Sequence, residues 1–114
     1  MAFAKVAALS SLGEARPTHV QVDGRDVCLV RLGDDVHAVL DTCSHEDYPL
    51  HEGYVFQGQL ECALHGSMFD LKTGDPESLP ATTPVPLFAV RVEGDDVLVD
   101  VEAPINDAPI PDHA

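Results

Sequence analysis

Two short motifs each combine a cysteine with a histidine: Cys43-x-His45 and Cys62-x-x-His65. Two thiolates and two imidazoles can hold a cluster of two irons and two sulfides, with both thiolates on one iron and both imidazoles on the other. Each iron of such a cluster is tetrahedral and needs two protein ligands besides the bridging sulfides. The cluster takes up and releases one electron. The two motifs therefore predict an electron-transfer centre between two loops that face each other.

Histidine ligation also sets the expected reduction potential. Replacing two thiolates with two neutral imidazoles removes two negative charges from the centre, so the reduced state is less penalised. Potentials then lie at roughly −150 to +300 mV, against roughly −400 mV for plant-type ferredoxins, whose ligands are all thiolates.

Zinc is the main alternative for this ligand set, because two cysteines and two histidines also suit a tetrahedral structural zinc site. Such sites more often pair Cys-x-x-Cys with spaced histidines than place one cysteine and one histidine on each loop. The alternative function would then be a zinc-stabilised structural or interaction module. Visible colour distinguishes the two hypotheses, because the iron-sulfur cluster absorbs visible light and zinc does not.

The segments that position the motifs are predicted to be almost entirely β-strand. β-Branched residues are frequent, no window has a convincing helical period, and pairs such as Asp23-Gly24 are typical of tight hairpin turns. The expected strands cover residues 3–9, 20–22, 27–32, 36–40, 54–57, 59–62, 67–71, 88–92 and 97–101. The predicted fold class is therefore all-β, with a base sandwich or barrel and a small cluster-binding subdomain inserted between its strands.

The length of 114 residues corresponds to one domain. We expect this domain to span residues 1–103, with the cluster-binding subdomain at about 42–86. Residues 104–114 contain three prolines and little apolar content. We therefore expect an irregular C-terminal tail.

The net charge of −14 at pH 7 is large for a chain of this size. It argues against nucleic acid and against anionic membrane surfaces, since both would repel the protein. Residues 32–71, which include both motifs, contain no lysine or arginine. This stretch is either a solvated acidic surface or a means of steering the protein towards a redox partner with a basic docking face.

The three cysteines indicate a reducing compartment. Two are already assigned as ligands, so a disulfide scaffold is not expected. No convincing signal peptide opens the chain, and no run approaches the roughly 18 apolar residues that span a bilayer. We therefore expect a soluble cytoplasmic protein.

The two motifs resemble the cluster-binding boxes of Rieske ferredoxins. The matching stretches are Cys43-Ser44-His45 and Cys62-Ala63-Leu64-His65-Gly66-Ser67, and the likeness continues through Phe69-Asp70, Thr73-Gly74, Pro80-Ala81 and residues 95–99. The resemblance implies the Rieske fold, with antiparallel β-sheets and the cluster at the tip of the small subdomain. A proline-containing loop, here residues 79–84, would cover it.

Specific roles follow from this resemblance. It implies that the ligands of the [2Fe-2S] cluster are Cys43, His45, Cys62 and His65. It also implies that the surrounding groups are Gly66, Ser67 and Pro80.

Two departures from the high-potential members of respiratory complexes are informative. Those members have an extra cysteine in each box, joined by a disulfide, whereas Tyr48 and Leu64 stand at the matching positions here. They also use a tyrosine near the second box to donate a hydrogen bond to sulfur, and Phe69 replaces it. Losing that bond disfavours the extra electron. We therefore expect a potential in the lower part of the Rieske range.

The soluble, disulfide-free type resembles the ferredoxin components of aromatic-ring dioxygenases. Those proteins carry electrons from a flavin-dependent ferredoxin reductase to a terminal oxygenase and are not themselves catalytic. The segment 79–86 is similar to that of small actinobacterial Rieske ferredoxins linked to iron-sulfur cluster assembly. An electron-transfer or accessory role in cluster assembly is therefore the alternative. A cluster-free reductase subunit is a further alternative, but such subunits lack the four ligands.

The remaining histidines and cysteine are expected to have ordinary roles. His51 lies between the boxes but outside both spacings, so we interpret it as a surface residue. His19, His37 and His113 have no evident partner in the sequence. Cys28 lies in an apolar strand and is expected to be a small buried side chain.

Overall fold

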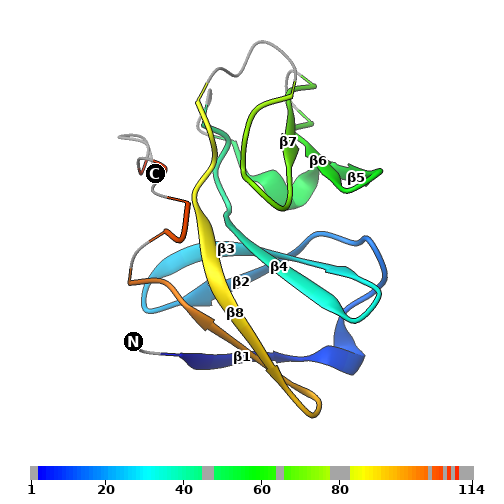
Figure 1. Ribbon diagram of the computed structural model, residues 1–114, viewed down its shortest axis with the longest axis vertical. Coiled ribbons are helices and arrows are strands. Elements are labelled where there is room, and N and C mark those ends of the chain that lie inside the picture. Colours follow the sequence, from blue (N-terminus) through cyan, green and yellow to red (C-terminus); the bar gives the residue numbers. More distant parts are fainter. Residues whose placement is uncertain are drawn as a thin grey trace.

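Two antiparallel sheets contain all the strands of the described chain. The computed structural model describes residues 3–44, 48–63, 66–77, 83–102, 104–106, 108 and 110. The six-stranded sheet has the order β1-β9-β8-β4-β3-β2 and the three-stranded sheet the order β5-β6-β7 (Figure 1). The large sheet contains β1 (Ala4–Ala8), β2 (Thr18–Val22), β3 (Arg25–Leu32), β4 (Asp35–Leu40), β8 (Leu87–Glu93) and β9 (Asp96–Asp100). The small sheet contains β5 (Tyr54–Phe56), β6 (Gln59–Glu61) and β7 (Met68–Asp70).

The predicted all-β class is confirmed, and each expected strand overlaps an observed one. The helical segments of the described chain are two single-turn 3₁₀ helices, η1 (Leu9–Ser11) and η2 (Leu50–Glu52). The β2–β3 hairpin turns at Asp23 and Gly24, which both have positive φ angles. This is the two-residue turn that matches the twist of paired strands. None of the helices in the described residues is long and apolar enough to cross a membrane.

The large sheet is a nearly closed barrel, which decides between the two predicted base architectures. Its β1 strand pairs with β9, and β4 pairs with β8. The chain between β1 and β2 returns to β3, where Glu14 forms a parallel bridge to Arg31. The Arg31 guanidinium also donates hydrogen bonds to the carbonyl oxygens of Leu9 and Leu12, at 3.1 and 3.4 Å. These contacts hold the segment between β1 and β2 against the barrel.

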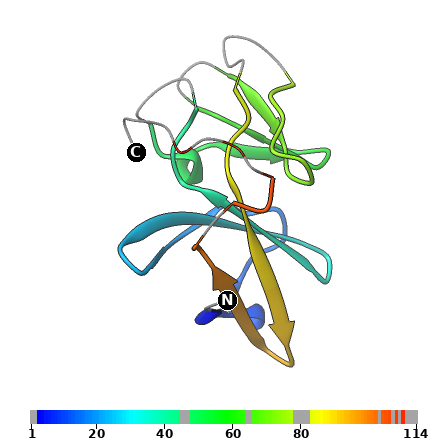
Figure 2. The same cartoon turned by 60° about the vertical axis from the view of Figure 1, so that its left-hand side comes forward.

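The small sheet lies at one end of the barrel (Figures 1 and 2). The chain leaves the barrel after β4 and returns in β8, and the Leu40 N–H donates to the Pro86 carbonyl at 2.9 Å where the two connections meet. The three-stranded sheet falls within the interval 42–86 that the sequence assigns to the cluster-binding subdomain. The exact limits of that subdomain and of the 1–103 domain stay predictions.

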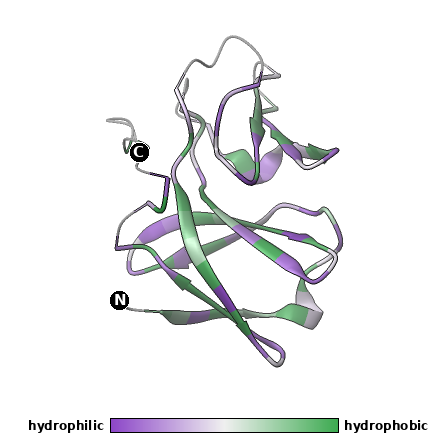
Figure 3. Cartoon of the chain, in the orientation of Figure 1, coloured by the Kyte–Doolittle hydropathy of each residue, from purple (hydrophilic) through white to green (hydrophobic). Residues whose placement is uncertain are grey.

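Two apolar cores meet at strand β3, whose central residues are buried on both faces. Val27 and Leu29 face the barrel interior, while Cys28 and Val30 face the small sheet. Figure 3 shows hydrophobic residues along the strands of both units and polar residues at several of the turns. The barrel wall is therefore also the base on which the small sheet rests.

Part of the predicted irregular tail packs at the connection between the two units. Among the described tail residues, Asn106 accepts a hydrogen bond from the Leu87 N–H at 3.0 Å. Its side-chain amide donates to the carbonyl oxygens of Val85 and Thr73, at 2.9 and 3.1 Å. These bonds hold the return connection into β8 at a fixed position relative to the turn that follows β7.

Candidate metal centre

The first motif begins a loop that leaves the end of β4. Cys43 is 1% exposed, and its N–H donates to the Tyr48 carbonyl at 3.0 Å, which closes the loop. The Ser44 hydroxyl donates to the Thr83 carbonyl at 2.6 Å. This bond joins the first loop to the proline-rich segment 79–84, of which residues 79–82 lie outside the described residues.

The second motif lies in the loop between β6 and β7. The Cys62 N–H donates to the Ser67 carbonyl at 2.7 Å, and the Gly66 N–H donates back to the Cys62 carbonyl at 2.8 Å. Gly66 has a φ of +77°, which glycine adopts far more readily than other residues. The glycine therefore allows the tight return of this loop, and Ser67 is buried at its end.

The structure brings the two predicted thiolate ligands into one apolar core. Cys43 and Cys62 are 1% and 0% exposed, and both belong to the core between the small sheet and the barrel. Their neighbours in this core include Leu50, Leu60 and Phe69. Two buried thiols that reach one dry core from two separate loops fit the thiolate half of a two-iron cluster. No disulfide joins any of the three cysteines, all of which are described.

The described chain contains both predicted thiolate ligands as well as Gly66 and Ser67, but not the other three predicted site residues. His45, His65 and Pro80 lie outside the described residues. In the part of the chain that is described, no group of three or more histidine, cysteine, aspartate or glutamate side chains is arranged to hold a metal ion.

Cys28 is the third thiol facing this core, and it belongs to the barrel wall rather than to a loop. It is completely buried, as the sequence predicts. Burial raises the pKa of the Cys28 thiol far above its usual range, and the nearby Asp41 charge adds to the increase. This cysteine is therefore a neutral packing residue.

A pair formed by the buried Asp41 and the half-buried His51 supports the first loop, and sequence reasoning missed it. The Asp41 side chain is 2% exposed, and its carboxylate accepts hydrogen bonds from the His51 backbone N–H at 2.7 Å and from the His51 ring Nδ1. The pair therefore joins the two ends of the Cys43 loop. No sequence motif marks it, because the two residues stand on either side of the loop and meet only when it closes.

A second aspartate–histidine pair lies beside the first on the barrel surface. His19 Nε2 is 2.9 Å from an Asp26 carboxylate oxygen, so this exposed histidine has a partner that was not evident in the sequence. The rings of His19 and His51 are 5.1 Å apart between centroids. His19 and Asp26 lie on the two strands of the β2–β3 hairpin, seven positions apart in the sequence.

We expect Asp41→Ala to loosen the first loop and lower the free energy of unfolding by about 2 kcal/mol, since two bonds to a buried carboxylate are lost. Urea denaturation of the holoprotein measures this. Asp26→Ala is the matched control: it removes the carboxylate of an exposed pair and should cost less than about 1 kcal/mol. Equal costs for the two variants would contradict the supporting role of Asp41.

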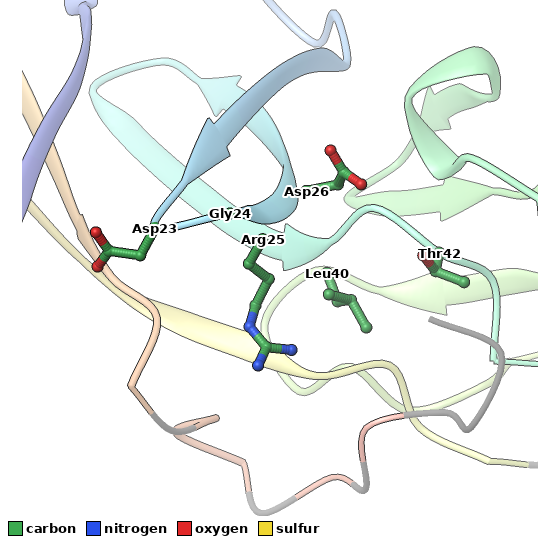
Figure 4. Close-up of a pocket in the computed structure, with 6 residues that line it drawn as sticks. All are labelled: Asp23, Gly24, Arg25, Asp26, Leu40 and Thr42. Atoms are coloured by element: carbon green, nitrogen blue, oxygen red, sulfur yellow. The ribbon is translucent and has the colours of Figure 1, made fainter.

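Two cavities lie near these loops. One of about 210 Å³ is lined by both aspartate–histidine pairs together with Thr42 and Pro49. The other, of about 250 Å³, lies at the β2–β3 turn and is lined by Asp23, Gly24, Arg25, Asp26, Leu40 and Thr42 (Figure 4). Figure 4 shows that the charged groups of Asp23, Arg25 and Asp26 point in different directions. Their charges therefore do not converge on one ligand.

Comparisons with known proteins agree on one family. A family model described as the Rieske [2Fe-2S] domain matches residues 2–89. The biphenyl 2,3-dioxygenase ferredoxin component of Rhodococcus jostii (strain RHA1) is 36% identical over 106 residues, covering 93% of this chain and 99% of the relative.

Solved structures give the same result. The ferredoxin of carbazole 1,9a-dioxygenase from Nocardioides aromaticivorans IC177 superposes with a TM-score of 0.84 at 39% identity, covering 91% of this chain and 99% of the other. A complex of reduced oxygenase and oxidised ferredoxin in carbazole 1,9a-dioxygenase contains a chain with a TM-score of 0.84 at 34% identity, with coverage of 90% and 96%. The predicted Rieske fold is confirmed.

Proposed function

This chain belongs to the Rieske [2Fe-2S] domain family, and from that membership we propose that it is a one-electron carrier between a reductase and a terminal oxygenase. The cofactor of the family is a [2Fe-2S] cluster, which stores one electron. The observation that carries the proposal is the meeting of Cys43 and Cys62 in one buried core at the ends of two closed loops.

We assign the cluster ligands from the two motifs. Cys43 and Cys62 would bind one iron as thiolates, and His45 and His65 would bind the other as imidazoles. The core around the thiols excludes water, and the bonds that close each loop hold the cysteines in place. Gly66, Ser67 and Pro80 are proposed to surround the cluster.

The partners follow from the relatives. The relatives named above are ferredoxins of dioxygenases, and one was solved in complex with its oxygenase. This supports a terminal oxygenase as the electron acceptor. It favours the delivery of electrons to an oxygenase over a role in cluster assembly or as a zinc-stabilised module. We further propose a flavin-dependent reductase as donor and a basic docking face on each partner, supported by the net charge of −14. Three cysteines without a disulfide support a cytoplasmic location.

Anaerobic titration of the purified holoprotein with dithionite tests electron carriage. We expect each molecule to take up one electron while its visible absorption bleaches, and ferricyanide to restore the oxidised spectrum. A protein that takes up no electron, or that fails to recover its spectrum after reoxidation, would refute the proposal.

Phe69 stands where the high-potential members of respiratory complexes have a tyrosine, and this difference predicts a lower reduction potential of the cluster. Phe69 is buried in the same apolar core as both cysteines. We expect the wild-type potential to lie below about +200 mV. Phe69→Tyr should raise it by about 40 mV, since a new hydrogen bond to sulfur is worth about 1 kcal/mol for one electron. Protein-film voltammetry of the two proteins measures the difference, and an unchanged potential would show that the ring does not reach a ligand sulfur.

A further inference from the structure

The three-stranded sheet has one buried and one outward face. In register, Val55, Leu60 and Phe69 form the row that packs into the apolar core. Their neighbours along each strand point to the other side, because side chains alternate across a sheet. The resulting surface, which we name the β5–β7 outer face, consists of Tyr54, Phe56, Gln59, Glu61, Met68 and Asp70.

Two aromatic rings dominate this outer face. Tyr54 and Phe56 are 67% and 63% exposed and stand on the same side of the edge strand β5. Five large hydrophobic side chains are exposed among the described residues, and these two alone share a strand. Met68 lies in the same row as Tyr54 and Glu61. Aromatic residues and methionine are the types enriched in the centres of protein interfaces.

The hairpin presents the rings on a firm support. Gln57 and Gly58 have φ angles of 51° and 77°, so β5 and β6 are joined by a tight two-residue turn. The Gly58 carbonyl accepts the Leu71 N–H at 3.1 Å. At the other end of β5, a side chain on Gly53 would collide with the Glu61 carbonyl, with its Cβ only 1.8 Å away. These contacts fix the backbone under the two rings, so little backbone entropy is lost when a partner docks.

The rim of the outer face is acidic. Glu61 and Asp70 lie on the face itself. Glu77 is exposed and its N–H donates to the Met68 carbonyl, and Glu52 is exposed two residues before β5. The nearest basic residue in the sequence is Lys72, and none occurs between it and Arg31. An apolar centre with a negative rim is complementary to an apolar patch with a positive rim.

The face also adjoins the candidate metal centre. Cys62 directly follows the last residue of β6, and Met68 opens β7 at the other end of the same loop. Figure 1 shows β5 at the free edge of the small sheet. A protein bound there would therefore contact the strands from which the Cys62 loop extends.

We propose that the β5–β7 outer face is a docking surface for a redox protein whose apolar patch is ringed by lysine and arginine. The proposal rests on the proposed function, because a docking surface for a redox protein serves a chain that carries electrons. Tyr54 and Phe56 supply the apolar contact, and the carboxylates orient the partner.

Ferricytochrome c, a small basic redox protein, is the probe. Each reduced holoprotein molecule gives up one electron, and one ferricytochrome c becomes ferrocytochrome c. Stopped-flow absorbance at low salt measures the second-order rate constant. The Tyr54→Ser/Phe56→Ser variant should react about fivefold more slowly, as expected when interface anchors are removed. The control, Val92→Ser/Ile105→Ser, removes two exposed apolar side chains elsewhere and should stay within about twofold of wild type.

The carboxylates are tested with a second matched pair. Glu61→Gln/Asp70→Asn should weaken the salt dependence of the rate more than Asp34→Asn/Asp35→Asn, which removes the same charge from the end of the β3–β4 hairpin. Equal changes would show that net charge alone attracts the probe. Visible spectra first confirm that every variant holds the same amount of cluster.

The outcomes separate this inference from the proposed function. A normal rate in the Tyr54→Ser/Phe56→Ser variant overturns the docking surface and leaves electron carriage intact. A wild-type protein that cannot be reduced, or that cannot pass its electron to the probe, overturns the proposed function itself. Sedimentation that shows a wild-type dimer, and a monomer in the aromatic variant, would assign the face to a second copy of the chain and overturn the proposed occupant.

Discussion

Replacing Cys62 with serine is expected to produce a colourless protein without iron. The Cys62 thiolate is one of two sulfur ligands in the proposed set, and the loop that carries it is closed by backbone bonds, so no other cysteine can move into its place. Metal binding and folding are coupled. We therefore also expect the free energy of unfolding to fall by about 4 kcal/mol or more, since loss of a metal centre is among the most damaging changes.

Cys28→Ala is the control for this experiment. Cys28 faces the same core and is as buried as Cys62, but it lies within β3 rather than on a loop. The alanine variant should keep its iron and its visible spectrum and lose only about 1 kcal/mol from a small cavity. Loss of colour in Cys28→Ala with full retention in Cys62→Ser would reverse the ligand assignment.

In His65→Cys protein that still holds a cluster, we expect the reduction potential to be lower than that of wild type by about 100 mV or more. A thiolate adds one negative charge where a neutral imidazole stood, which penalises the reduced state. The potentials of centres with two imidazoles and of centres with four thiolates differ by at least about 250 mV, from roughly −150 to roughly −400 mV. Replacing one imidazole should therefore lower the potential by about half of that difference. Redox titration followed by visible circular dichroism measures the shift.

His37→Cys makes the same chemical change in β4, at a histidine to which we assign no role. Its potential should stay within about 20 mV of wild type. His65→Ala completes the series and should lose the cluster. A normal cluster spectrum in His65→Ala, or an unchanged potential in a cluster-bearing His65→Cys, would show that His65 is not a ligand.

The strands were predictable because their signals are local. Alternating apolar residues and the Asp23-Gly24 turn specify the β2–β3 hairpin within a few residues, and the observed register follows from them. The pairing of β1 with β9 was not predictable in this way. Its partners are joined by no turn, so only the closing of the barrel brings them together.

The candidate site also combines features that were predictable from local sequence with features that were not. The spacing within each motif was enough to nominate Cys43 and Cys62, and the structure places both in one core. The Asp41–His51 pair was not predictable, because a buried carboxylate and a histidine ten residues later match no chemical motif. The bonds of Asn106 to the connection before β8 were missed for a related reason. A tail rich in proline shows no periodicity, although one of its side chains can still dock.

The most direct test of the central claim is the metal and sulfide content of the protein purified without oxygen. We predict two irons and two acid-labile sulfides per chain, a red-brown colour, and a paramagnetic signal that appears after reduction with dithionite. A colourless protein with one zinc per chain, or iron without sulfide, would contradict the assignment of Cys43, His45, Cys62 and His65 to a [2Fe-2S] cluster.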